Sequence, residues 1–195
     1  MAGKIGEVIE VSTTELVAQC YELHQAPDFG SFVRVSDGSA DIYAIVCHAS
    51  TSGIDPGRRP VARGKDEVDE DDIFRNNPEL PELLRTEFSA AIVGFVEDGL
   101  VRQYLPPRPP RLHSFVHTCS LAEAKAFSQQ LDFLQTLVTA NLRVPADELI
   151  AACIRQAGLA HQGDRTFLVR AGKELATLLV NDINRLNGIL RRIGR

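Results

Sequence analysis

The 195-residue sequence lacks any apolar stretch long enough to cross a bilayer. A spanning helix needs about 18 to 20 consecutive apolar residues, and no run approaches that length. The first seven residues also place an acidic residue, Glu7, where the apolar part of a secretory leader would have to be continuous. We therefore expect no membrane partner and a cytoplasmic location.

Closely spaced cysteine pairs are missing as well. No two cysteines form a C-x-x-C pair, which excludes a zinc ribbon and a thioredoxin-like motif. Each cysteine has apolar neighbours, so we expect four free thiols in apolar surroundings. They are Cys20, Cys47, Cys119 and Cys153.

The sequence contains no recognisable nucleotide site and no nucleophile motif. A P-loop requires G-x-x-x-x-G-K-[ST], but the segment around Gly172-Lys173 has Phe167 at the first glycine position and Glu174 at the hydroxyl position. The G-x-S-x-G elbow of serine hydrolases is also absent. We expect no enzymatic activity, no catalytic residues and no cofactor.

One group of residues has the composition of a metal site. His113, His117 and Cys119 would lie on one face of a strand, because side chains alternate along a strand. No fourth ligand and no H-E-x-x-H motif accompany them. Packing at a strand edge is therefore favoured over metal binding.

Positive charge is scarce in the first part of the chain. Residues 1 to 111 carry 11 basic and 19 acidic side chains, whereas residues 112 to 195 carry 10 and 7, which gives −8 and +3. Neither part has the strongly basic patch that nucleic-acid binding requires. Direct nucleic-acid binding is disfavoured.

What the first 118 residues do contain is strand-forming sequence. Runs of β-branched and aromatic residues predict strands, and Asp37-Gly38 predicts a tight hairpin turn because both residues tolerate positive φ. Asp98-Gly99 has the same character. The predicted strands are residues 5–11, 15–23, 31–35, 41–48, 90–96, 100–104 and 113–118.

A polar excursion interrupts these strands at about residues 50–88. Arg58 and Arg59 lead into an acidic run at residues 66–72, and a short helix is expected after Pro78 or Pro81. The charges could form a docking loop for a charged partner, with Arg58 and Arg59 as contact residues. A mobile solvated loop is the favoured alternative, because exposed ion pairs contribute little.

From Ser120 onward the apolar period changes to that of helices. Ser120 and Glu123 predict a capping box, and the helix that follows is expected to reach about Asn141. A second helix is expected after Pro145, with Gly158 as its stop. A third, at about 173–192, follows a strand-like segment at 166–169.

The third predicted helix carries an apolar stripe with 3,4 spacing. Its burial is worth on the order of 10 kcal/mol gross, so the stripe has to pack on another surface. Packing on the helix that begins after Ser120 is favoured, and dimerisation through the same stripe is the alternative. The candidate protein-contact residues of the stripe are Leu179, Ile183, Leu186, Leu190 and Ile193.

The strand sequences together resemble a known family. The segments are IGEVIEV (5–11), FGSFVRV (29–35), IYAIV (42–46), IVGF (92–95) and PPRPP (106–110). They resemble the HAS barrel, the small β-barrel of HerA-type DNA translocases and rotary ATP synthases. The resemblance implies a non-catalytic barrel that sits beside other barrels as a crown on a ring ATPase, while the ATPase domain itself is missing from this sequence.

The sequence thus predicts an α+β fold in two parts. Residues 1–118 form a small closed β-barrel and residues 119–195 form a helical domain of about three helices. The expected function is that of a non-catalytic protein-interaction or oligomerisation module, whose partner is another protein or a second copy. The alternatives are an accessory factor of a nucleic-acid translocase or nuclease, and an enzyme of unrecognised type.

Overall fold

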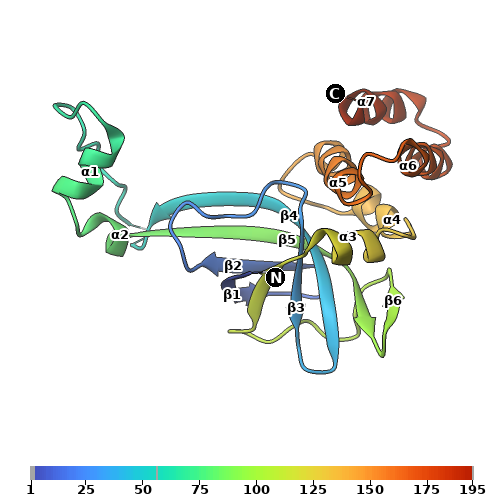
Figure 1. The fold of residues 1–195 in the computed structure, drawn as a ribbon, viewed down its shortest axis with the longest axis horizontal. Helices are drawn as coiled ribbons and strands as arrows, with labels where there is room; N and C mark the ends of the chain where they lie inside the picture. Colours follow the sequence, from blue (N-terminus) through green and yellow to red (C-terminus); the bar gives the residue numbers. More distant parts are fainter. Residues whose placement is uncertain (1–2, 56, 195) are drawn as a thin grey trace.

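The computed structural model describes residues 3–55 and 57–194 and shows one antiparallel sheet with the C-terminal helices on one side (Figure 1). The sheet has the strand order β2-β1-β7-β3-β4-β5-β6, and β2 also pairs with β5. That additional pairing closes six strands into a barrel, which confirms the predicted closed sheet. The strands are β1 (Lys4–Val11), β2 (Glu15–Cys20), β3 (Phe32–Ser36), β4 (Ala40–Gly53), β5 (Leu84–Glu97), β6 (Leu100–Arg102) and β7 (Phe115–Thr118).

Strands far apart in sequence complete the barrel wall. On one side Ala18 of β2 lies opposite Phe88 of β5. On the other side β7 lies between β1 and β3, where Val116 is opposite both Gly6 and Val35. The wall therefore depends on a strand that follows the other five in the sequence.

The barrel interior is filled by alternate residues of each strand. Val33 and Val35 of β3 point inward, while Phe32 faces the helices. β4 is buried on both faces from Ile42 to Cys47, which explains the continuous apolar run there. The largest interior side chains are Leu16, Ile42, Phe88, Ile92 and Phe95.

Helices cover the outer face of the barrel and share a hydrophobic cluster with it. Phe127 stacks on Tyr43 of β4 with ring centroids 4.6 Å apart, and it lies 6.0 Å from Phe32 of β3. The division of the chain at 118/119 stays a prediction, since these two groups of elements bury a common core. The helices are α1 (Glu70–Asn76), α2 (Leu80–Leu83), α3 (Leu121–Phe127), α4 (Phe133–Thr139), α5 (Ala146–Ala160), α6 (Arg165–Leu178) and α7 (Ile183–Ile193).

No helix within residues 3–55 and 57–194 combines sufficient length with sufficient apolar character to cross a bilayer.

Two local predictions are confirmed in atomic detail. At the β3–β4 turn Gly38 has φ of 93°, and the Asp37 carboxylate accepts hydrogen bonds from the amides of Ser39 and Ala40. At the start of α3 the Ser120 hydroxyl accepts the Glu123 amide, and the Glu123 carboxylate accepts the Ser120 amide. Both predictions depended only on residues that are close neighbours in the sequence.

The helix predicted to run from Ser120 to about Asn141 is broken. α3 ends at Phe127 and α4 begins at Phe133. The side chain of Gln103, just after β6, occupies the break: its amide nitrogen donates to the carbonyls of Phe127 (2.6 Å) and Gln130 (3.0 Å), and its oxygen accepts the Phe133 amide (3.1 Å). One buried amide replaces the helical hydrogen bonds that the break removes.

The later helix boundaries also differ from the predictions. α5 passes through Gly158 and ends at Ala160, and residues 166–169 belong to α6 instead of a strand, because Asp164 caps that helix by accepting the Thr166 amide. The helix expected at 173–192 is two helices, since Asp182 caps α7 by accepting the Arg185 amide.

Candidate functional site

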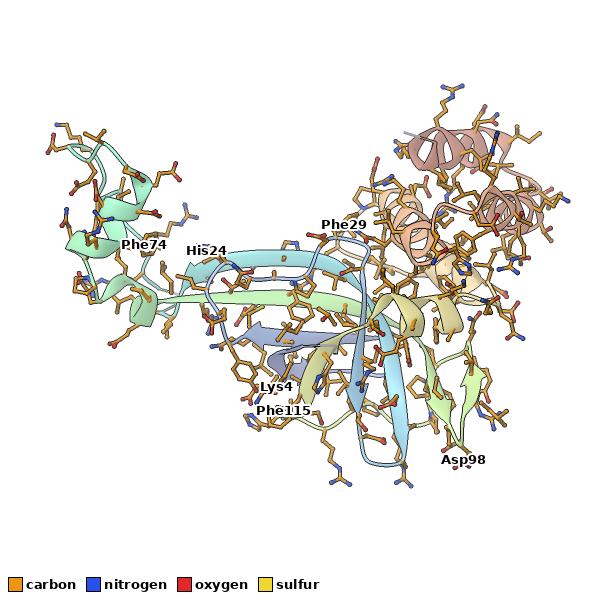
Figure 2. All side chains as sticks on the ribbon, in the orientation of Figure 1. Lys4, His24, Phe29, Phe74, Asp98 and Phe115 are labelled. Atoms are coloured by element: carbon orange, nitrogen blue, oxygen red, sulfur yellow. The ribbon has the colours of Figure 1, made fainter. Side chains whose placement is uncertain are left out.

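The β4–β5 hairpin extends far beyond the barrel wall as an arm (Figures 1 and 2). The ladder between β3 and β4 ends at Ile45, and the ladder between β2 and β5 ends at Glu87. β4 and β5 nevertheless remain paired with each other as far as Gly53 and Leu84. The excursion is therefore shorter than the expected 50–88, because its first and last residues belong to the arm.

Hydrogen bonds from the loop between β2 and β3 brace the arm. The His24 amide donates to the Thr86 hydroxyl at 2.8 Å, and the hydroxyls of Thr51 and Thr86 are 2.8 Å apart across the two strands. The His24 ring also meets Phe74 of α1 edge-on, with ring centroids 6.1 Å apart (Figure 2). These contacts connect the arm to the loop between β2 and β3 and to α1.

We call residues 54–83 the arm tip; they carry α1 and α2. Asp69 caps α1 by accepting the Asp71 amide, and the acidic residues of its first turn lie at the positive end of the helix dipole. Neither α1 nor α2 has a buried residue. The described residues of the tip are therefore held by capping, turns and ion pairs, without a core of their own.

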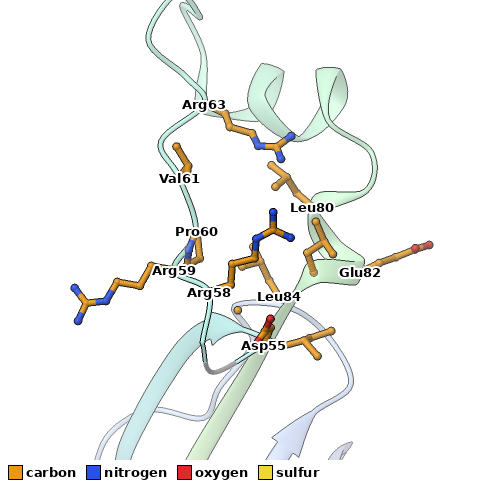
Figure 3. A pocket seen from close by; sticks show the side chains of 12 residues that line it. Asp55, Arg58, Arg59, Pro60, Val61, Arg63, Leu80, Glu82 and Leu84 are labelled. Atoms are coloured by element: carbon orange, nitrogen blue, oxygen red, sulfur yellow. The ribbon is translucent and has the colours of Figure 1, made fainter.

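A pocket of about 380 Å³ lies where the arm tip joins the two strands (Figure 3). Its apolar lining is unusually exposed, since Ile54 is 49%, Leu83 51% and Val61 79% exposed. The complete lining is Gly53, Ile54, Asp55, Arg58, Arg59, Pro60, Val61, Arg63, Leu80, Glu82, Leu83 and Leu84.

The arginines of the pocket differ in their surroundings. Arg63 donates to Glu79 at 2.6 Å and to Asn77 at 2.8 Å, and its charge is thereby compensated. Arg58 points over the apolar lining, whereas Arg59 points away from it (Figure 3). Among residues 3–55 and 57–194 neither Arg58 nor Arg59 has an ion pair or a side-chain hydrogen bond. The Arg58 guanidinium is available to a ligand that enters the pocket.

The apolar stripe predicted as a contact surface packs mainly within the chain. Leu179 is buried, and Leu186 and Ile193 are half-buried against the core. Ile183 and Leu190 remain exposed, at 66% and 37%.

The partner of this stripe is α5, not the helix after Ser120. Arg185 of α7 pairs with Asp147 of α5 at 2.7 Å, and Arg192 pairs with Glu148 at 2.5 Å. α7 makes its most extensive contacts with α5. The two ion pairs and the apolar stripe together fix α7 on the outside of the helical layer.

The candidate metal ligands do not form a cluster. His113 precedes β7, has a left-handed φ of 64° and lies 3.0 Å from the Glu7 carboxylate, so the expected strand at 113–118 begins only at Phe115. Burial raises the pKa of the Cys119 thiol to about 12, which disfavours the thiolate that binds metals. Within the described ranges no three His, Cys, Asp or Glu side chains meet as ligands.

The structure contains a buried serine–histidine pair that was not predicted from the sequence. The Ser128 hydroxyl lies 2.9 Å from His161 Nε2 and donates to the Ala124 carbonyl, and the imidazole stacks on Phe167 at 4.0 Å. Burial lowers the pKa of His161. Because Ser128 has no solvent exposure, the pair joins α3 to α5 and does not offer a nucleophile. The two residues are 33 positions apart, so no local motif marks them.

Comparison with known protein families finds no match, and comparison with curated proteins finds no relative. A function can therefore be argued only from the geometry. Its parts are a closed barrel, a helical layer and a projecting arm with a partly cationic pocket.

Proposed function

We propose that this chain is a non-catalytic protein-interaction and oligomerisation module of the HAS-barrel type, with the β4–β5 arm as its contact element. In this proposal the barrel and the helices form a stable cytoplasmic base. The observation that carries it is the arm itself, which holds exposed apolar side chains away from the core of its own chain.

The low stability and the open edge of a two-stranded arm in water support a contact role for it. A two-stranded ribbon is only marginally stable in water, and an exposed edge strand is open to unwanted pairing. The outer half of β4 is exposed and is not paired on its second edge within the described residues. Exposed apolar groups that are gathered in one place are typical of interaction sites.

The charge of the arm tip favours a protein over a nucleic acid as partner. Residues 54–83 contain five basic and nine acidic side chains, which gives −4. A phosphate backbone would meet net repulsion there. The helical layer is a weaker candidate for the contact, since α7 already uses its stripe within the chain.

Removal of the arm tip tests this proposal. Gly53 and Leu84 are paired neighbours, so an Asn-Gly turn can join them directly in place of residues 54–83. Light scattering over a range of protein and salt concentrations should give a multiple of 21.4 kDa for the full chain and a monomer for the tipless chain. Equal association of both chains, or a full chain that stays monomeric at every concentration, contradicts the proposal.

A further inference from the structure

The arm tip presents an apolar side chain between free carboxylates. Val68 is fully exposed in the loop that precedes α1. Asp66 and Glu70 lie two residues to either side, and both are exposed. Neither carboxylate has an ion pair or a side-chain hydrogen bond within the described ranges. We call residues 66–70 the acidic knob.

The pocket at the base of the same tip has the complementary chemistry. Ile54 and Leu83 expose apolar surface, and the Arg58 guanidinium projects over it without a carboxylate partner among the described residues (Figure 3). A ligand that suits this pocket has a small apolar group with a carboxylate beside it. Val68 of the same chain does not line the pocket.

We propose that the occupant of the pocket is the acidic knob of a second copy of this chain. This inference rests on the proposed function, because it names the partner of the arm. Val68 of each copy enters the pocket of the other, and Asp66 and Glu70 approach Arg58. Both parts belong to one excursion, so a two-fold arrangement forms the same contact twice.

Charge favours the acidic knob of a second copy over a nucleic acid as the occupant of the pocket. The arm tip is acidic as a whole, with a net charge of −4, but its pocket is lined by three arginines and two acidic residues. Tips that meet without register would therefore repel one another. Only the arrangement that brings knob to pocket sets opposite charges together, which fixes the register of the contact.

A charge exchange tests this arrangement in the full chain. Arg58→Glu makes the pocket acidic, and Asp66→Arg with Glu70→Arg makes the knob basic. Each change alone opposes like charges at both contacts of the pair. We expect the dissociation constant to rise about tenfold or more for each variant, since like charges that face each other are strongly unfavourable.

The two variants should recover association when they are mixed. In the mixed pair the acidic pocket meets the basic knob, and the basic pocket of the second chain meets the acidic knob of the first. Light scattering and native mass spectrometry should therefore show a heterodimer from two chains that are monomeric separately. This recovery also shows that both variants are folded, which circular dichroism checks independently.

Two matched controls accompany the exchange. Arg108→Glu makes the same charge change at an exposed residue that follows β6 and does not line the pocket. Asp98→Arg reverses one carboxylate charge, half of the change in the knob variant, at the exposed β5–β6 turn. Both should leave the dissociation constant within about twofold of the parent value, because neither lies at the contact and exposed charges act weakly at a distance.

The outcomes separate this inference from the proposed function. Unchanged association of the Arg58 and knob variants, or a mixture that stays monomeric, overturns the knob-and-pocket arrangement while the tipless chain still shows that the arm is needed. A tipless chain that associates like the parent, or a parent that is always monomeric, overturns the role of the arm as well.

Discussion

Replacement of Gln103 by methionine should destabilise the protein through the break between α3 and α4. Methionine keeps the approximate length of the side chain but removes the donor and the acceptor. The carbonyl of Phe127 and the amide of Phe133 then lose their partners in the interior, where both residues are almost fully buried. Each unsatisfied buried group costs about 1–3 kcal/mol, so the loss of both partners should lower the free energy of unfolding by about 2–6 kcal/mol.

Urea denaturation, followed by circular dichroism at equilibrium, measures this loss. Gln129→Met is the matched control, because Gln129 is exposed in the same break and a surface substitution of this kind stays within about 0.5 kcal/mol. If Gln103→Met and Gln129→Met have the same midpoint and slope, Gln103 does not hold the break and our explanation of it is wrong.

Three further predictions concern the core, one histidine and the thiols. Phe127→Ala should lower the free energy of unfolding by about 3–5 kcal/mol, whereas Phe115→Ala, at an exposed side chain, should change it little. In Phe127→Ala the circular dichroism of the helices and the tyrosine fluorescence should still be lost in one transition; separate transitions would show that barrel and helices fold independently. Because burial holds the pKa of His161 below its ordinary value, the unfolded chain binds the extra proton, and stability should fall as pH decreases from about 6.5; His161→Gln should flatten that part of the urea-midpoint profile, and an unchanged profile would contradict the assignment. Burial also raises the pKa of Cys47 to about 11 and of Cys20 to about 11, so both thiols should react with a disulfide reagent far more slowly at pH 8 in the native protein than in urea; equal rates would show that they are accessible.

Features encoded by neighbouring residues could be predicted from the sequence. The Asp37-Gly38 turn and the Ser120–Glu123 capping box depend on atoms within three residues of each other, and both were found. The barrel interior was also predictable, because alternation along β3 and the continuous run in β4 reflect burial on one face and on two faces.

The break at residues 128–132 could not be predicted in the same way. The apolar period of 3.6 continues across it, and Leu131 and Leu134 are both buried as expected. The cause is Gln103, which lies 24 residues before Phe127 and directly follows β6. Local periodicity contains no information about such a partner.

Other differences had signals that local patterns obscured. Asp182 is an N-cap residue in the middle of the predicted third helix, so the division between α6 and α7 was visible in principle. Residues 166–169 have strand-like composition, yet a short apolar run does not distinguish strand from helix. The outer part of β4 was missed because both of its faces are exposed and its residues therefore do not alternate.

The candidate site was predicted only in part. The charges of Arg58 and Arg59 were evident in the sequence, but not that one points over a pocket and the other away from it (Figure 3). The apolar lining comes from three separate segments around Ile54, Val61 and Leu83. It exists only because the strands pair as far as Gly53 and Leu84 and bring those segments together.

The position of β7 between β1 and β3 has a consequence for biosynthesis. Until residues 115–118 leave the ribosome, the nascent chain has a gap in its wall and two strands with unsatisfied backbone groups beside it. Such long-range closure slows folding and prolongs exposure to aggregation. The newly made N-terminal half should therefore depend on chaperones or on rapid translation until its final strand arrives.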